Sequence, residues 1–263
     1  MANDLNGVYA SGVEAVAGEL RQEFIDEARE RVGALDVALD AVRNGRKDPA
    51  ELTAVFRKTA LAFRSQAANV GLRLIGTLAY RLEDYLANAR ELPPRALDDL
   101  QVFIDRLDDV LEGRLAPDSD ASQVVRDLPS KIGISAAEIE VRNIEVMLVM
   151  LHGTATHFVE RELQQCGYRV NTVTTVFEAF PLIVRTKPDL VVVSAIMPEL
   201  DGIDLAIGLA AMPATRNIPL AVITSLDPGD EHLAMVPKHI PVIQKGPSFG
   251  DDLFKALDSL FLI

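Results

Sequence analysis

The 263-residue chain contains no tryptophan, one cysteine and four histidines, and none of the histidines lies before residue 150. A lone Cys166 cannot form an internal disulfide, which fits a reducing cytoplasm. No apolar run approaches the roughly 18 to 20 residues that span a bilayer. The acidic N-terminus also lacks the basic and then apolar order of a secretory signal. We therefore expect a cytoplasmic protein without a membrane segment.

The charge balance is acidic, with 26 Lys and Arg against 39 Asp and Glu and a formal net charge of −13. Neither half of the chain is basic, so the electrostatic signature of nucleic-acid binding is missing. The few aromatic side chains offer little surface on which bases could stack. A hydrophobic fraction of 49% is sufficient for a buried core. We expect a globular protein whose partners are proteins.

The first half of the chain has the apolar period of helices. Apolar side chains recur every three or four residues over 13–43, 49–70 and 72–90, and again in a stretch that begins at Pro94. In the first stretch Val16, Leu20 and Phe24 are expected to begin the core-facing row. Short connections between the stretches predict an all-α, up-down four-helix bundle over residues 1–116.

The period changes after this bundle. Residues 117–142 are interrupted by Pro, Gly, Ser and Asp, which predicts a linker with one short helix near Ser122–Leu128. Over residues 143–263, short apolar runs alternate with helical stretches of about ten residues. This alternation predicts an α/β domain with a parallel sheet covered on both faces. The apolar runs lie at 146–151, 168–173, 190–193, 220–224 and 240–243.

The stretch PDLVVVSAIMPELDG at 188–202 is similar to the third strand and the following loop of response-regulator receiver domains. Gly167, Pro219, Thr224 and Lys245 also stand where that family has them. The resemblance implies a flavodoxin-like (βα)5 domain whose parallel sheet has the strand order 2-1-3-4-5.

The receiver positions that carry phosphoryl chemistry are altered. The resemblance places Ser194 at the position of the aspartate nucleophile, and Leu151-His152 at that of the acidic pair that binds magnesium. Magnesium requires carboxylate oxygens, and without it the charge on a transferring phosphoryl group is largely uncompensated. Thr224 and Lys245 are retained, and we interpret them as a strand cap and a solvated loop residue. The domain therefore resembles a degenerate receiver, or pseudoreceiver, without a metal.

The stretch FRKTALAFRSQAANVGL at 56–72 resembles the phosphoacceptor helix of histidine-phosphotransfer (HPt) domains, and EFIDEARERVGALDVALDAV at 23–42 is similar to the opening of the phosphotransfer domain of chemotaxis kinases. Where the family has its histidine, lysine and first glycine, this chain has Leu61, Arg64 and Ser65. A leucine has no nucleophilic nitrogen and cannot accept a phosphoryl group. The bundle therefore resembles a degenerate HPt domain.

By the three- and four-residue spacing of a helix, Leu61 shares a face with Arg57, Lys58, Arg64 and Ser65. An apolar side chain surrounded by basic ones suits a docking surface for an acidic partner. A single exposed leucine is also common on protein surfaces and carries no meaning by itself.

Both resemblances together favour a non-enzymatic adaptor of two-component signalling that needs no cofactor. Its partners would be a histidine kinase, a phosphotransferase or a response regulator. One alternative is an unconventional phosphotransfer protein that uses another residue such as His152, although a lone imidazole is more often a loop residue. Another is a scaffold in which the bundle pairs two copies as a homodimer.

Overall fold

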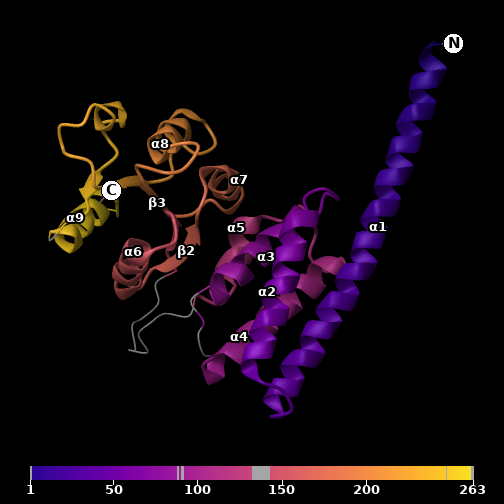
Figure 1. Ribbon diagram of the computed structural model, residues 1–263. Helices are drawn as coiled ribbons and strands as arrows, with labels where there is room; N and C mark the ends of the chain where they lie inside the picture. Colours follow the sequence, from indigo (N-terminus) through magenta and orange to yellow (C-terminus); the bar gives the residue numbers. More distant parts are fainter. Residues whose placement is uncertain (1, 88, 90–91, 132–142, 247, 262–263) are drawn as a thin grey trace. The chain divides into compact units, whose positions relative to one another are not determined.

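The computed structural model describes residues 2–87, 89, 92–131, 143–246 and 248–261, and it divides into two compact units, Met1–Ile132 and Gly133–Ile263. The first unit is all-α, and the second alternates strands with helices (Figure 1). In the described part of the chain, no helix combines the length and the apolar character needed to cross a membrane.

The first unit confirms the predicted all-α bundle. Asp48 caps its second helix, because the Asp48 carboxylate accepts a hydrogen bond from the Ala50 N–H at 2.7 Å. Pro49 and Pro94 begin the second and fourth helices, where the first turn needs no N–H donor. The helices are α1 (Ala2–Arg43), α2 (Pro49–Gln66), α3 (Arg73–Leu86), α4 (Pro94–Leu111) and a short α5 (Ala121–Arg126).

Aromatic side chains occupy the centre of the bundle. Phe24 of α1 meets Phe63 of α2 edge to face, with ring centroids 6.0 Å apart, and Tyr85 of α3 packs on Phe103 of α4 at 5.5 Å. The buried Tyr85 hydroxyl donates to an oxygen of Asp99 at 2.6 Å, so the polar end of the ring has a partner. Burial raises the pKa of the Tyr85 phenol, and the Asp99 carboxylate raises it further.

The row of α1 that faces the core is shorter than predicted. Phe24, Ala28 and Leu35 are buried, but Val16 and Leu20 are exposed. Figure 1 shows the reason, because the N-terminal part of α1 continues past the other helices of the bundle. An apolar period predicts a helix face, but only a neighbouring helix can bury that face.

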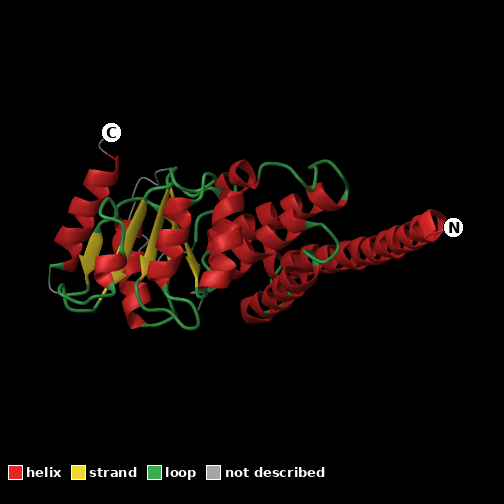
Figure 2. Cartoon of the chain, turned by 90° about the horizontal axis from the view of Figure 1, so that it is seen from above, coloured by secondary structure: helices red, strands yellow, loops and turns green. Residues whose placement is uncertain are grey.

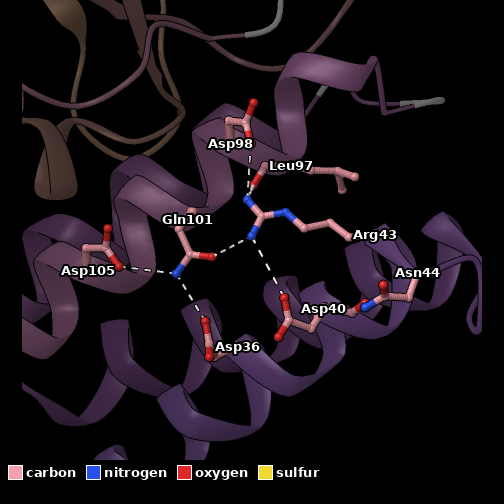
Figure 3. Close-up of polar contacts among 8 residues, drawn as sticks. All are labelled: Asp36, Asp40, Arg43, Asn44, Leu97, Asp98, Gln101 and Asp105. Carbon is pink, nitrogen blue, oxygen red and sulfur yellow. Dashed lines mark hydrogen bonds and ion pairs between the residues drawn. The ribbon is translucent and has the colours of Figure 1, made fainter.

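The end of α1 is tied to α4 by a polar cluster (Figure 3). The Arg43 guanidinium donates to the Leu97 carbonyl and the Asp98 carboxylate, both at 3.1 Å, and to the Gln101 side-chain oxygen at 3.0 Å. The Gln101 amide then donates to Asp36 at 3.0 Å. Exposed ion pairs contribute only about 0–1 kcal/mol each, so this cluster mainly fixes the register of α1 on α4.

The first unit extends beyond the expected boundary at residue 116. In α5, whose N-terminus is capped by Asp120, Ala121 and Val125 lie in the core of the bundle. The buried Lys131 ammonium pairs with the Asp84 carboxylate of α3 at 2.9 Å. The short helix predicted near Ser122–Leu128 is therefore present, but it belongs to the bundle. The rest of the predicted linker, from residue 132 to 142, lies outside the described residues.

The second unit has a five-stranded parallel sheet in the order β2-β1-β3-β4-β5, which confirms the predicted topology. Every residue of β1, β3 and β4 is buried, as expected for inner strands of a parallel sheet. The strands are β1 (Glu145–Val149), β2 (Arg169–Val173), β3 (Leu190–Ser194), β4 (Leu220–Thr224) and β5 (Val242–Gln244).

Helices cover both faces of this sheet (Figure 2). One face packs on α6 (Thr154–Gln165) and α9 (Phe249–Phe261), and the other on α7 (Val176–Thr186) and α8 (Gly202–Ala211). Between β4 and β5 stands only the 3₁₀ turn η1 (Leu233–Met235). Because all five strands run in one direction, the residues after β1, β3, β4 and β5 meet at the carboxyl edge of the sheet.

Candidate functional site

Leu61 lies near the middle of α2 and points away from the core. Its side chain is 57% exposed, while Phe56, Ala60 and Phe63 of the same helix are fully buried. The predicted exposure of Leu61 is therefore confirmed. Val55 of the same helix is also partly exposed, at 39%.

The basic neighbours of Leu61 are held in different ways. Arg57 donates to the Leu86 carbonyl at the end of α3 at 2.6 Å. Arg64 forms a 2.7 Å ion pair with Glu83 of α3, so part of its charge is offset. Lys58 is exposed on the same face. The surface is thus preorganised by α3, but it is less positive than the sequence pattern alone suggests.

Ser65 adds no free hydroxyl donor to this face, because its Oγ donates to the Ala62 carbonyl at 2.9 Å. Such a bond to the preceding turn of a helix is common for serine. The Arg64 guanidinium also lies over the ring of Tyr80, 5.4 Å from the centroid. Together with the Glu83 pair, this contact holds Arg64 against α3.

The charge of this region differs from that of the whole chain. Residues 52–82 contain five basic side chains and no acidic one, although the net charge of the protein is −13. A balance taken over the whole half of the chain hides this local excess, and a short window along the sequence would have found it. The five basic residues are Arg57, Lys58, Arg64, Arg73 and Arg81.

Ser194 ends β3 beneath the carboxyl edge of the second unit, and its side chain is only 6% exposed. Its hydroxyl donates to the Ile196 carbonyl at 3.2 Å and accepts from the Lys245 ammonium at 3.4 Å, a long hydrogen bond. Burial lowers the pKa of the Lys245 ammonium. The structure therefore brings Ser194 and the retained Lys245 together. The prediction that Lys245 is a solvated loop residue is wrong, because its side chain is partly buried and its ammonium donates to the Ser194 hydroxyl.

Thr224, at the end of β4, is buried and makes two bonds that order this edge. Its hydroxyl accepts from the Leu226 N–H at 3.0 Å, and its carbonyl accepts from the Lys245 N–H at 2.7 Å. Through these bonds Thr224 links the end of β4 to the loop that follows it and to the end of β5.

Leu151 and His152 follow β1, and both side chains are exposed. The Leu151 carbonyl accepts a hydrogen bond from the Thr156 hydroxyl at the start of α6. Neither side chain offers the carboxylate that a magnesium ion needs. Across the described residues, no group of three or more His, Cys, Asp or Glu side chains could hold a metal ion.

Gly202 closes the loop after β3 over this edge. The Gly202 N–H donates to the Ala195 carbonyl at 3.0 Å, and a Cβ at this position would lie 2.0 Å from the Ser194 carbonyl oxygen. Only glycine fits such an approach. The loop also carries Ile196, an exposed apolar side chain two residues after Ser194 that its sequence motif does not reveal as exposed.

A known family model matches most of the first unit. Residues 19–113 match the family model of the Hpt domain. This match confirms the predicted resemblance of the bundle, and the matched residues include α2 with Leu61. It supports a role in two-component signalling, whose partners are proteins. Comparison with curated protein sequences gives no match.

Solved structures similar to this chain include receiver domains and response regulators. One belongs to a signal transduction histidine kinase of Syntrophus aciditrophicus, with 26% identity and a TM-score of 0.40 over 44% of this chain and 88% of that one. Another is a chemotaxis response regulator of Vibrio cholerae, with 20% identity and a TM-score of 0.39 over 45% and 98%. A third is the receiver domain of a sensor histidine kinase of Pseudomonas aeruginosa, with 20% identity and a TM-score of 0.39 over 44% and 94%.

Proposed function

We propose that this chain is a non-enzymatic adaptor of a two-component pathway, which docks a histidine kinase, a phosphotransferase or a response regulator without accepting a phosphoryl group. The observation that carries the proposal is the exposed Leu61 at the position of the family's histidine. The position remains accessible to a partner, but its side chain can only form contacts. We place the adaptor in the cytoplasm, because a chain with one cysteine has no internal disulfide that an oxidising compartment would form.

The second unit supports the same proposal. Ser194 replaces the aspartate nucleophile of the resemblance and lies buried against Lys245, while Leu151 and His152 replace the acidic pair. A phosphoryl acceptor at this edge would have neither a carboxylate nucleophile nor a magnesium ion to offset developing charge. Regulation of this chain would then come from partner binding or abundance, because a switch requires a differential interaction with two states.

The chemistry of the α2 surface indicates an acidic partner. We define this surface by Leu61 with Arg57, Lys58, Arg64 and Ser65. A leucine anchor can supply apolar burial at the centre of a contact, and the surrounding cations favour encounter with negative charge. Receiver domains, as the family resemblance implies, are acidic around their active sites and so have suitable charge.

His152 offers the second candidate function, phosphotransfer through an unexpected residue. Its imidazole is exposed directly after β1 and carries a nucleophilic nitrogen. Leu151 beside it supplies no carboxylate, so the acceptor would work without the family's metal site. Phosphoryl label on His152 would favour this function over the adaptor.

Partner capture with matched variants tests the proposal. The intact chain is immobilised, and proteins bound from a cytoplasmic extract are identified for the wild type, Leu61→Glu and Val55→Glu. Val55 is also exposed on α2 but lies outside the α2 surface, so it controls for a new carboxylate on this helix. We expect Leu61→Glu to lose kinase or regulator capture by at least about tenfold and Val55→Glu to retain it. Equal capture by both variants would refute the Leu61 surface.

A further inference from the structure

A small apolar groove in the second unit lies between α7 and the segment that follows β3. Its volume is about 210 Å³, and Phe177 at its mouth is 61% exposed. Sites for small molecules begin at about 300 Å³, so this groove suits one inserted side chain better than a free ligand. The lining residues are Val176, Phe177, Phe180, Pro181, Leu200, Asp204 and Leu205.

The groove has one charged lining residue, Asp204, which belongs to the segment after β3. That segment, residues 195–215, also carries Glu199 and Asp201 and contains no lysine or arginine. On the α7 side the Arg185 guanidinium donates to the carbonyl of the lining residue Pro181 at 3.1 Å, so the negative charge belongs to the segment after β3 alone. An apolar lining with a carboxylate on an acidic segment fits an apolar side chain that has basic neighbours.

The chain itself carries such a group on the α2 surface. Leu61 is 57% exposed and is flanked by Arg57 and Lys58, within a stretch that has five basic residues and no acidic one. We propose that the groove of one copy binds Leu61 and its basic neighbours from a second copy. Charge complementarity selects this occupant, because the Asp204 segment and the α2 surface have opposite charge in the same chain.

This contact uses the α2 surface of the proposed function but needs no other protein. Self-association and partner docking therefore compete for Leu61. At high abundance, copies bound to one another would have fewer α2 surfaces available for a kinase or regulator. The attraction between exposed charges is also screened by salt, so association should weaken as ionic strength rises.

Sedimentation velocity of the intact chain over a concentration series tests the contact. We expect concentration-dependent association that Leu61→Glu and Phe177→Asp each weaken by at least about tenfold. Phe254→Asp is the matched control, since Phe254 of α9 is 67% exposed and lies outside the groove. Circular dichroism checks that each variant keeps the fold. If Phe177→Asp and Phe254→Asp change self-association equally, the groove is not the contact site and the proposal is refuted.

A charge exchange identifies the two surfaces as partners. Lys58→Glu and Asp204→Lys each place like charges together and should weaken association, whereas the double variant should restore it. Association of Asp204→Lys at wild-type strength would overturn the contact. A wild-type chain that stays monomeric at every concentration would also overturn the contact, even if another basic protein binds the groove.

The same variants separate this inference from the proposed function. Asp204→Lys leaves the α2 surface unchanged, so it should lose self-association and retain partner capture. Leu61→Glu should lose both. If Leu61→Glu loses partner capture while the wild type is monomeric at every concentration, the proposed adaptor function is retained. Only the contact between two copies is then refuted.

Discussion

The two positions at which the family resemblances expect a phosphoryl acceptor differ in access. Leu61 stands out from α2 in the first unit, surrounded by Arg57 and Lys58, whereas Ser194 lies closed beneath its loop in the second. The first position carries a leucine and is accessible. The second carries a serine and is covered by the loop that Gly202 closes. We infer that the bundle position serves contact, and that the receiver position serves the stability of its own domain.

The difference also concerns charge. Around Leu61 the arginines are ordered by α3, through the Leu86 carbonyl and the Glu83 carboxylate. Beside Ser194, the Lys245 ammonium is partly buried and its pKa is lowered by that burial. An ordered, exposed cation can meet a partner's carboxylate, while a partly buried one is directed at its own domain.

The largest loss of stability is expected at the ion pair that joins α3 to the segment after α5. The α3 helix also orders the α2 surface. Asp84→Ala removes the carboxylate 2.9 Å from the buried Lys131 ammonium. Breaking such a buried pair costs about 3–5 kcal/mol, because a charge remains inside the protein. Urea unfolding measures the loss. As a control, Asp98→Ala breaks the exposed pair with Arg43 and should cost at most about 1 kcal/mol.

The closed loop of the second unit gives the next largest effect. In Gly202→Ala the new Cβ would lie 2.0 Å from the Ser194 carbonyl oxygen, so backbone must shift. We expect a loss of about 1–3 kcal/mol in the free energy of unfolding. Gly208→Ala in the same helix meets no atom within 4 Å and should stabilise α8 by about 0.5–1 kcal/mol. Equal stabilities of the two variants would contradict a loop that is closed over Ser194.

Glu83→Gln changes the charge of the α2 surface. It removes the negative charge that pairs with Arg64 at 2.7 Å, and so leaves the α2 surface more positive. Because the pair is partly exposed, we expect a gain of only about threefold in affinity for an acidic partner, and the gain should fade with salt. Surface plasmon resonance at two ionic strengths measures it. Glu112→Gln, which breaks the pair of Arg29 on another part of the bundle, should leave the affinity unchanged.

The smallest effect is a pH dependence from Lys245. Burial disfavours the charged form, so the pKa of the folded state lies below that of the unfolded state. The cost of the charged Lys245 is fully present below the folded pKa and disappears as the pH rises through it. Lys245→Met should therefore be more stable than the wild type at neutral pH, and the gap should close toward about pH 10. Thermal unfolding over this pH range tests it, with the exposed Lys238→Met as control. A gap that widens with pH would contradict the assignment.

Much of the fold follows from local pattern. The buried runs at 190–193 and 220–224 could be recognised as inner strands because every residue in them is apolar or small, and the sheet order followed from the receiver resemblance. The early part of α1 could not be placed, since the period that includes Val16 and Leu20 does not say where the neighbouring helices end. Likewise α5 is too short to reveal from its sequence that it completes the bundle.

At the candidate site, the exposure of Leu61 could be predicted from the helical spacing of Phe56 and Phe63. The partners of Arg57 and Arg64 could not, because they depend on how α3 packs beside α2. The groove beside Phe177 and Asp204 was also missed. It is built from two segments about 20 residues apart, and each of them looks like an ordinary helix start when taken alone.

Phosphoryl transfer to this chain is measured by incubating the intact chain with a labelled small-molecule phosphodonor and magnesium and, separately, with a phosphorylated kinase or regulator that the chain captures. The label is then located by mass spectrometry. We predict no stable phosphoryl group on α2, at Ser194 or at His152, while the captured partner itself is labelled. An acid-labile phosphoryl group on His152 would contradict the proposed adaptor function.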